Sequence, residues 1–223
     1  MGRASAIRAV VFDCDDTLIH AHEQGIDNLK LVAGKLGLEL PPESFIREHW
    51  GKGWREFVES VFPGVDQDSF KEAYISYFSS LKPPLPVQGA GEVIDLLSRK
   101  FVLGIVTGGE RNLFLYKMMG ARMDLGKFAF MLTEGEIGKP KHEPGYFDPV
   151  LQELARLGIR KEEVLFVGDS VHDLAMARTA GIPFVGVLTG VSGRRDFLRE
   201  GLDQLSVIPS VMELPWFIEN NGF

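Results

Sequence analysis

The chain has 223 residues, of which 45% are hydrophobic and 25% charged, so it is long enough for one or two domains with a sizeable core. Its 24 Lys and Arg residues against 31 Asp and Glu residues give a net charge of −7, which argues against a nucleic-acid partner bound through a basic surface. The single cysteine excludes an intramolecular disulfide, and no apolar run approaches the roughly 20 residues of a membrane helix. Composition therefore predicts a soluble, cytoplasmic protein without a membrane partner.

Four short apolar runs, each followed by polar or glycine residues, predict buried strands. They cover residues 7–12, 102–106, 164–167 and 184–188. None alternates between apolar and polar residues, which is typical of strands buried on both faces. Helical patterns separate the runs, and this order predicts an α/β fold with a doubly wound, Rossmann-like parallel sheet. Such sheets bind ligands outside the carboxyl ends of their strands, where the polar residues of this sequence gather.

One long segment, residues 20–85, contains helical patterns and no strand pattern. The helical patterns cover residues 23–36, 45–50, 54–62 and 70–78. Several consecutive helices between two strands exceed the usual single-helix crossover. We therefore interpret residues 20–85 as an inserted helical domain and residues 1–19 and 86–223 as the α/β core. The alternative is that these helices only cover the sheet.

Two carboxylates follow the first predicted strand, in the sequence Asp13-Cys14-Asp15-Asp16. In an extended segment, residues two apart point to the same side, so Asp13 and Asp15 face one direction. Crowded carboxylates repel unless a proton or cation lies between them, and hard oxygen ligands suit Mg²⁺. An aspartate can also act as a nucleophile and form a phosphoryl-aspartate. The alternative is a loop that only favours Asp.

Polar residues also follow the second and third strands of the core. Thr107 and Gly108 offer a hydroxyl and an open backbone amide to phosphate oxygens. Asp169 supplies another carboxylate for a metal, and Ser170 or Asp173 can cap the helix that follows. An ordinary turn and a capped helix start are the alternatives at these two places.

The loop at residues 138–144 contains two prolines, Lys139 and Lys141, and it precedes a helical pattern. A lysine held beside a proline can place one positive charge next to two carboxylates and a phosphate. Most lysines are solvated surface charges, so this loop alone does not indicate a site.

Taken in order, these segments resemble the motifs of the haloacid dehalogenase superfamily of phosphohydrolases. FDCDDTL is similar to the first motif of that family, IVTGG to the second, the GKP lysine to the third and VGDSVHD to the fourth. The place of the helical insertion matches the C1 type of cap, and the C-terminal segment is similar to that of phosphoglycolate-phosphatase-like members. The resemblance implies a Mg²⁺-dependent phosphatase that hydrolyses a small phosphorylated metabolite, a phosphomonoester.

The resemblance also implies a role for each motif residue. Asp13 would be the nucleophile, and Asp15 the general acid that later becomes the base activating water. Mg²⁺ would be held by Asp13, the backbone carbonyl of Asp15 and Asp169. The groups expected to hold the phosphoryl oxygens are Thr107, the amide of Gly108 and Lys139.

Two departures from the family pattern affect this assignment. Asp16 stands where the family most often has Gly. The usual Lys-Pro-x-Pro phrase reads Lys-Pro-Lys-His, so Lys141 competes with Lys139 as the phosphate-binding lysine. We favour Lys139, because Pro140 and Pro144 then keep their family spacing. An acid at the second position of the first motif argues against dehalogenation.

The loop at residues 50–55 is the most distinctive part of the insertion. In C1-capped members a loop here reaches the active site, so Lys52 or Arg55 is expected to contact the substrate. The alternative is that both tryptophans of this loop pack in the cap and the cations are solvated.

Two other functions fit parts of the pattern: a phosphomutase of the β-phosphoglucomutase type, and a non-catalytic phosphate-binding or receiver-like protein. The complete set of motif residues favours the phosphatase. The sequence leaves open the substrate, the role of Asp173, and whether the protein is a monomer or a homodimer.

Overall fold

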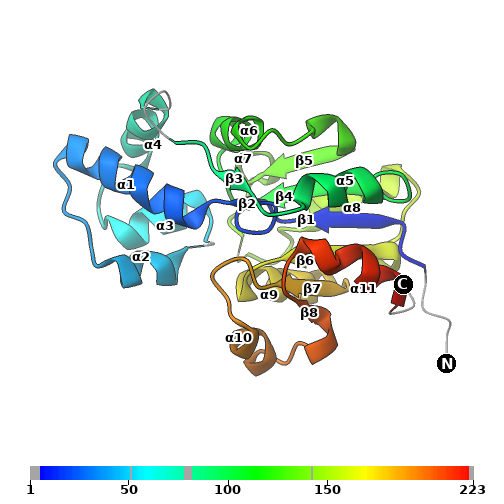
Figure 1. The fold of residues 1–223 in the computed structure, drawn as a ribbon. Coiled ribbons are helices and arrows are strands. Elements are labelled where there is room, and N and C mark those ends of the chain that lie inside the picture. The colour runs from blue at the N-terminus through cyan, green and yellow to red at the C-terminus, as the bar shows by residue number, and fades with distance from the viewer. Residues whose placement is uncertain (1–5, 51, 78–81, 142, 221–223) are drawn as a thin grey trace.

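The apolar runs of the sequence form the centre of a six-stranded sheet (Figure 1). The computed structural model describes residues 6–50, 52–77, 82–141 and 143–220. The strands of the sheet are β1 (Ala9–Phe12), β4 (Val102–Thr107), β5 (Phe130–Thr133), β6 (Val164–Gly168), β7 (Phe184–Val187) and β8 (Val207–Ile208). Their spatial order is β5-β4-β1-β6-β7-β8, and every neighbouring pair is parallel. The predicted α/β fold with a parallel, Rossmann-like sheet is confirmed.

Some predicted segments lie outside the described residues. These are residues 1–5, 78–81 and 221–223 of the predicted domains, Gly51 of the loop at 50–55, and His142 of the lysine loop.

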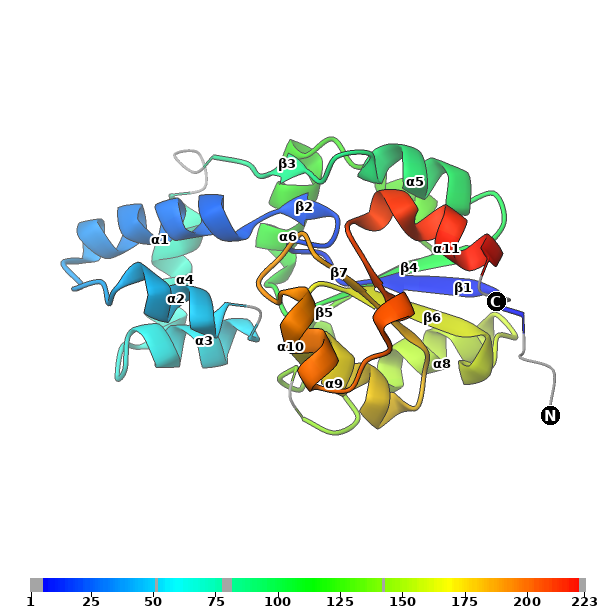
Figure 2. The same cartoon turned by 60° about the horizontal axis from the view of Figure 1, so that its bottom comes forward.

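Helices cover both faces of the sheet, as Figure 2 shows. One face carries α5 (Ala90–Leu97), α6 (Arg111–Gly120) and α11 (Leu214–Asn220), and the other carries α7 (Glu134–Ile137), α8 (Asp148–Arg156), α9 (Val171–Ala180) and α10 (Arg194–Arg199). Successive residues of a strand point to opposite faces. Val10 and Phe12 of β1 accordingly pack in the first core, while Ala9 and Val11 pack in the second. This explains why β1 reads as an uninterrupted apolar run.

Four helices lie together beside the sheet (Figures 1 and 2), and we call them the helical cluster. They are α1 (His22–Leu36), α2 (Glu43–His49), α3 (Trp54–Val61) and α4 (Gln67–Ser76). Their apolar faces form a third hydrophobic core, which includes Ile26, Phe57 and Phe70. A short antiparallel pair, β2 (Ile19–His20) and β3 (Leu85–Pro86), joins the helical cluster to the rest of the chain. The boundaries at residues 20 and 85 stay a prediction.

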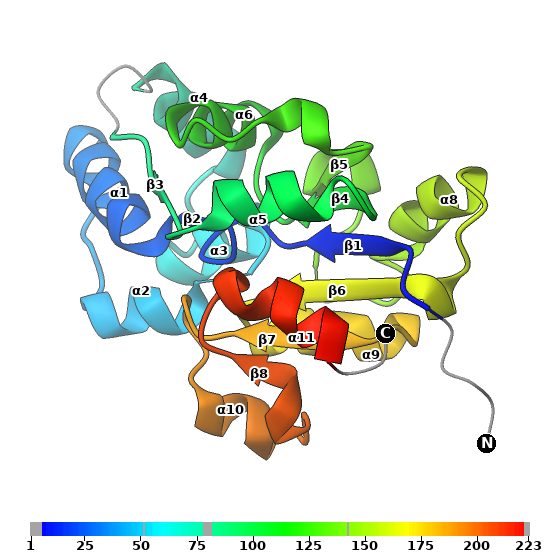
Figure 3. The ribbon, with the colours of Figure 1, turned by 45° about the vertical axis from the view of Figure 1, so that its right-hand side comes forward.

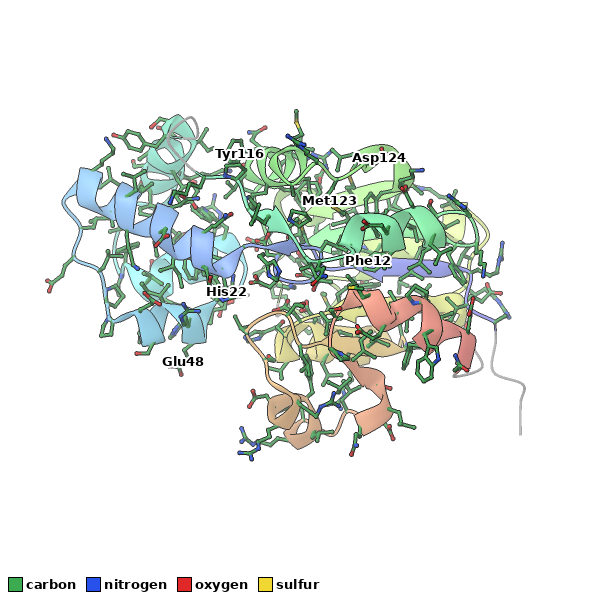
Figure 4. All side chains as sticks on the ribbon, in the orientation of Figure 1. Phe12, His22, Glu48, Tyr116, Met123 and Asp124 are labelled. Atoms are coloured by element: carbon green, nitrogen blue, oxygen red, sulfur yellow. The ribbon has the colours of Figure 1, made fainter. Side chains whose placement is uncertain are left out.

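Asp16 fixes the start of α1 to the end of the first motif. Its carboxylate accepts hydrogen bonds from the backbone N–H groups of Ala21 (2.9 Å) and His22 (3.2 Å). The ring of His22, labelled in Figure 4, lies 2.9 Å from the same oxygen through Nδ1. Asp16 has a φ of 60°, in the left-handed region that favours glycine and that Asp tolerates better than most residues. The backbone conformation therefore accounts for the glycine that the family most often has here.

The carboxyl ends of β1 and β6 point toward the side of the molecule where the helical cluster lies (Figure 3). Motif residues end or follow three adjacent strands, since Asp13 follows β1, Thr107 ends β4 and Asp169 follows β6. Within the described residues, no helix combines the length and the apolar composition needed to cross a bilayer.

Candidate active site

Three buried carboxylates meet at the carboxyl end of the sheet. Asp13 and Asp169 follow neighbouring strands, and Asp173 lies in the first turn of α9. One oxygen of each carboxylate lies within 4.8 Å of one oxygen of each of the others. None of the three residues is more than 4% exposed. The parallel pairing of β1 with β6 thus brings together two acidic motifs that lie far apart in the sequence.

Lys141, and not Lys139, supplies the positive charge at this place. Its ammonium lies 2.9 Å from Oδ1 of Asp13 and 2.7 Å from Oδ1 of Asp173, and the side chain is 6% exposed. Lys139 is exposed and donates a hydrogen bond to the backbone carbonyl of Pro144 (3.2 Å). The geometry therefore corrects our preference for Lys139.

The proline spacing that we took to favour Lys139 is wrong for that lysine and favours Lys141. The family phrase Lys-Pro-x-Pro has its second proline three residues after the lysine. Pro144 lies three residues after Lys141 but five after Lys139. Counting from the second proline of the loop selects the lysine that the structure brings to Asp13.

Burial and the neighbouring charges shift the pKa values of Asp13, Asp169 and Lys141. Burial raises the pKa of Asp13 to about 7; Lys141 opposes the rise and Asp173 adds to it. Burial, together with Asp173 and Asp13, raises the pKa of Asp169 well above its ordinary value. Burial disfavours the ammonium of Lys141, but Asp13 and Asp173 outweigh that effect and raise its pKa. Lys141 is therefore a fixed cation beside Asp13 and Asp169, whose carboxylates resist ionisation.

The donor set fits a divalent cation. If all three carboxylates were ionised, one ammonium would leave two negative charges without compensation in a buried site, and a divalent cation would supply the missing positive charge. Asp173 is occupied on both oxygens, because Lys141 binds Oδ1 and Ser170 donates to Oδ2 through its hydroxyl (2.6 Å) and its N–H (3.1 Å). Asp173 therefore positions Lys141, and Asp13 and Asp169 are the carboxylates placed to bind a metal. Hard oxygen donors of this kind suit Mg²⁺.

The loop after β7 closes over Asp169 and depends on a glycine. Val191 donates its N–H to Oδ2 of Asp169 (3.1 Å). A Cβ atom at Gly190 would lie only 1.8 Å from the same oxygen. Only glycine lets the backbone approach this closely, so the loop orients the carboxylate without displacing it.

Thr107 and Gly108 lie on the other side of Asp13, in a cavity between the sheet and the helical cluster, which we call the junction cavity. Thr107 is 3% exposed, and the hydroxyl of Tyr146 donates to its carbonyl (3.0 Å). The carbonyl of Gly108 accepts a hydrogen bond from the N–H of Trp54 (3.3 Å), at the start of α3. The helical cluster therefore contacts the second motif directly, and Thr107 and Gly108 share one cavity with Asp13 and Lys141.

The comparison with known families agrees with this geometry. Residues 7–181, more than half of the chain, match the family model of haloacid dehalogenase-like hydrolases. The chain belongs to the haloacid dehalogenase-like hydrolase family. The predicted resemblance is confirmed, and the protein is a hydrolase of this family whose four motif segments all lie within the matched residues.

Curated relatives match over most of their length. A phosphoglycolate phosphatase from Nitrosospira multiformis is 28% identical over 97% of this chain and 97% of its own. A phosphoglycolate phosphatase from Photorhabdus laumondii is 28% identical over 82% of this chain and 81% of its own. The pyrophosphatase PpaX from Bacillus pumilus is 27% identical over 92% of this chain and 97% of its own.

Solved structures of low sequence identity share the fold. A haloacid dehalogenase-like family protein from Streptococcus pneumoniae superposes with a TM-score of 0.76 at 19% identity, covering 95% of this chain and 98% of its own. The Bacillus subtilis protein YfnB, in a form bound to magnesium, superposes with a TM-score of 0.71 at 17% identity, covering 96% of this chain and all of its own. At these identities the likeness concerns the fold alone.

Asp15 of this haloacid dehalogenase-like hydrolase has a partner that the sequence did not indicate. It lies in the junction cavity, and the ammonium of Lys117, on α6, donates to both oxygens of its carboxylate. Lys117 lies 102 residues away in the sequence, within an ordinary helical pattern. No local motif marks it, so only the packing of α6 against β1 and β4 shows the contact.

The two cations predicted on the insertion have different positions in the hydrolase. Lys52 lines the junction cavity, where its ammonium lies 3.0 Å from Glu56 and donates to the hydroxyl of Ser60 (3.3 Å). Arg55 is 61% exposed and pairs with Asp68 (3.0 Å). Arg55 does not line the junction cavity among the described residues, so its predicted contact with substrate has no geometric support.

Proposed function

We propose that this hydrolase is a Mg²⁺-dependent phosphatase of a small phosphomonoester and that it acts through a phosphoryl group carried on Asp13. The observation that carries the proposal is the buried pair of Asp13 and Lys141 beside the carboxylate of Asp169. A carboxylate that is buried next to a fixed cation suits an attack on phosphorus, because the cation offsets the charge of the incoming phosphate.

In the first step a carboxylate oxygen of Asp13 forms a bond to phosphorus. The bond between phosphorus and the ester oxygen breaks, and Asp15 gives a proton to that leaving oxygen. Lys141, the hydroxyl of Thr107 and the amide of Gly108 stabilise the negative charge on the transferred phosphoryl oxygens. All of these groups line the junction cavity.

In the second step a water molecule attacks the phosphoryl group on Asp13. Asp15, now a carboxylate, takes a proton from that water, and the bond between phosphorus and Asp13 breaks. Inorganic phosphate leaves, and the carboxylate of Asp13 and the proton on Asp15 are restored. One carboxylic group therefore serves as acid and then as base, while Asp13 remains the nucleophile.

Asp13, Asp169 and the backbone carbonyl of Asp15 would hold the Mg²⁺. When bound, the ion would neutralise charge on the phosphoryl oxygens and on the buried carboxylates. The unbalanced carboxylate charge of the site supports this assignment. The magnesium-bound form of YfnB gives it a precedent in a protein of the same fold.

The relatives and the junction cavity support a small substrate. The curated relatives are named for phosphoglycolate and for pyrophosphate, which are both small and anionic. The cavity encloses about 100 Å³ of water-accessible space, and the helical cluster closes one side of it through Trp50, Trp54 and Phe57. We assign residues 20–85 as a C1-type cap that excludes water from the reaction.

A phosphate-release assay with p-nitrophenyl phosphate tests the proposal. We expect turnover that needs Mg²⁺, is abolished by chelation and falls by at least about 1,000-fold in Asp13→Asn. Asp95→Asn, at an exposed carboxylate that pairs with Lys127 on the surface, serves as the matched control and should keep full activity. Full activity of Asp13→Asn would refute the assigned nucleophile.

The same assay separates the alternatives. A phosphomutase would interconvert sugar phosphates faster than it releases phosphate. A receiver-like protein would hold a long-lived phosphoryl group without turnover. Continuous release of inorganic phosphate from a simple ester is expected only of the phosphatase.

A further inference from the structure

A second lysine, which is partly buried, lines the junction cavity beside the proposed general acid. Lys117, on α6, donates to both oxygens of Asp15, and its side chain is 14% exposed. Lys141 lies instead at Asp13, where the phosphoryl group would be transferred. Asp15 serves the ester oxygen in the proposed reaction, so Lys117 lies on the side of the leaving group.

The surroundings of Lys117 offer little other compensation for its charge. Leu113, Tyr116 and Tyr74 line the cavity nearby, and Tyr74 is 6% exposed. Tyr116, labelled in Figure 4, lies on the side of α6 that packs against the helical cluster. Within the described parts of the chain, Asp15 is the one ion-pair partner of Lys117. Burial disfavours the ammonium, but Asp15 outweighs this effect and raises the pKa of Lys117, so the group is charged at neutral pH.

Lys117 is placed to contact a substrate as well as Asp15. An ammonium has three N–H donors, and the carboxylate of Asp15 accepts from it through two oxygens. Lys117 and Asp15 line the same cavity, so a negative group next to the ester oxygen of a bound substrate would lie within reach of this ammonium. Hydrogen bonds between an ammonium and an anionic group are stronger than those between neutral groups.

Three buried polar atoms of the junction cavity lack hydrogen-bond partners among the described residues. They are the indole N–H of Trp54, the side-chain carbonyl oxygen of Gln24 and Oδ2 of Asp16. Buried polar atoms are normally paired in folded proteins. The indole N–H is the one donor of the three, so it indicates that a ligand with an acceptor group completes the cavity.

We propose that Lys117 determines specificity by binding a negative group carried on the leaving group, next to the oxygen that bonds to phosphorus. A carboxylate and a second phosphate group share this chemistry. The inference rests on the proposed phosphatase function, and it assigns to the core helix α6 the recognition that the sequence suggested for Lys52 or Arg55.

The test compares two substrates that differ in one charge. 2-Phosphoglycolate carries a carboxylate next to its ester carbon, and 2-hydroxyethyl phosphate carries a neutral hydroxymethyl group in that place. In Lys117→Met we expect kcat/KM for 2-phosphoglycolate to fall by at least about 30-fold, largely through a higher KM, because the site loses the group that pairs with the carboxylate. The value for 2-hydroxyethyl phosphate should fall as well, because Asp15 loses its partner, but by at least about 10-fold less than the value for 2-phosphoglycolate. Inorganic pyrophosphate, in a parallel series, shows whether a phosphate group is recognised in the same way.

Two variants complete the design. Lys117→Arg keeps a cation and should retain most of the discrimination between the two substrates, whereas Lys117→Gln should lose it, as Met does. Lys100→Met, at a surface lysine paired with Glu219, is the matched control and should behave as wild type. A loss for 2-phosphoglycolate, for pyrophosphate or for both that clearly exceeds the loss for 2-hydroxyethyl phosphate supports the proposal. Equal losses for charged and neutral substrates, or no loss at all, would overturn it.

The failure of this inference is distinguishable from the failure of the proposed function. p-Nitrophenyl phosphate has a leaving group that needs no protonation and carries no charge next to the ester oxygen. If wild-type protein and Lys117→Met both hydrolyse it with Mg²⁺ while the selectivity between the other substrates is unchanged, only the role of Lys117 is refuted. If wild-type protein does not hydrolyse it, the phosphatase itself is refuted.

Discussion

Lys139 and Lys141 lie two positions apart in one loop, yet their ammonium groups have different surroundings. Lys141 is buried between Asp13 and Asp173, and Lys139 is exposed. We expect Lys141→Met to lower kcat/KM for p-nitrophenyl phosphate by on the order of 100-fold or more, because the phosphoryl oxygens lose a fixed cation. Lys139→Met should change it by less than about 3-fold. The opposite order of the two losses would return the assignment to Lys139.

The residues of the site differ in how far the sequence could predict them. Asp13 and Asp169 were predictable, because each directly follows a buried strand and such strands end at one edge of the sheet. The choice between the two lysines depended on which one the loop turns inward, and a local pattern constrains that weakly. Lys117 was not predictable, since its partner Asp15 lies on another element and neither the spacing nor the composition of α6 marks it.

The strands and helices also differ in how well the sequence predicts them, and the difference follows how far each element is buried. The four central strands were predicted because both of their faces are covered. The edge strand β5 was missed, since two of its four residues are only partly buried, and β8 was missed because it has two residues. The four helices of the helical cluster begin within three residues of their predicted starts, because their apolar residues follow a helical spacing.

The contact between Asp16 and His22 makes the start of α1 depend on pH. The hydrogen bond from Asp16 raises the pKa of His22, against the effect of burial. The folded state therefore holds the proton more tightly than the unfolded chain, in which a histidine has a pKa of about 6.5. The stabilisation is fully present below that value and is lost as the pH rises through the higher pKa of the folded state.

We therefore expect His22→Gln to lower the free energy of unfolding more at acidic than at alkaline pH. The excess at about pH 5.5 over that at about pH 8.5 should be roughly 0.5 to 1 kcal/mol, since His22 is partly exposed while its partner Asp16 is buried. Urea unfolding at the two pH values measures it. His20→Gln, at an exposed histidine on β2, is the control and should show no such excess. A His22→Gln effect that is equal at both pH values would contradict the assigned ion pair.

The molecule as a whole contains three separate hydrophobic cores among its described residues. Two of them cover the faces of the sheet, and the third belongs to the helical cluster. The junction cavity lies where the third core meets the sheet, so residues of both parts line it. Leu113 of α6 packs in the third core, and Lys117 follows one helical turn later at Asp15. The helix that supports the helical cluster thus also carries the proposed specificity residue.

The carboxylates of the site oppose the stability of the molecule when no metal is bound. Burial raises the pKa of Asp169 well above its ordinary value, so the folded state binds its proton more tightly than the unfolded chain does. Its ionisation therefore lowers the stability of the fold as the pH rises above the ordinary pKa of an aspartate, which is about 3.9. The repulsion from Asp13 and Asp173 contributes to this loss.

Asp169→Asn should consequently stabilise the metal-free protein at neutral pH and remove its response to Mg²⁺. The amide oxygen can still accept the hydrogen bond from Val191, while the buried charge is gone, so we expect a gain of roughly 1 to 3 kcal/mol in the free energy of unfolding. Saturating Mg²⁺ should stabilise the wild-type protein by about 2.7 kcal/mol at 100 times its dissociation constant, and the variant far less. Urea unfolding with Mg²⁺ and with a chelator measures both effects.

The difference in the free energy of unfolding between Asp169→Asn and the wild-type protein should become smaller or change sign when Mg²⁺ is added. The reason is that the ion stabilises the ionised carboxylate that otherwise destabilises the fold. A wild-type protein whose stability is unchanged by Mg²⁺ would contradict the assigned metal site, whereas a destabilised Asp169→Asn would show that this carboxylate is already compensated without a metal.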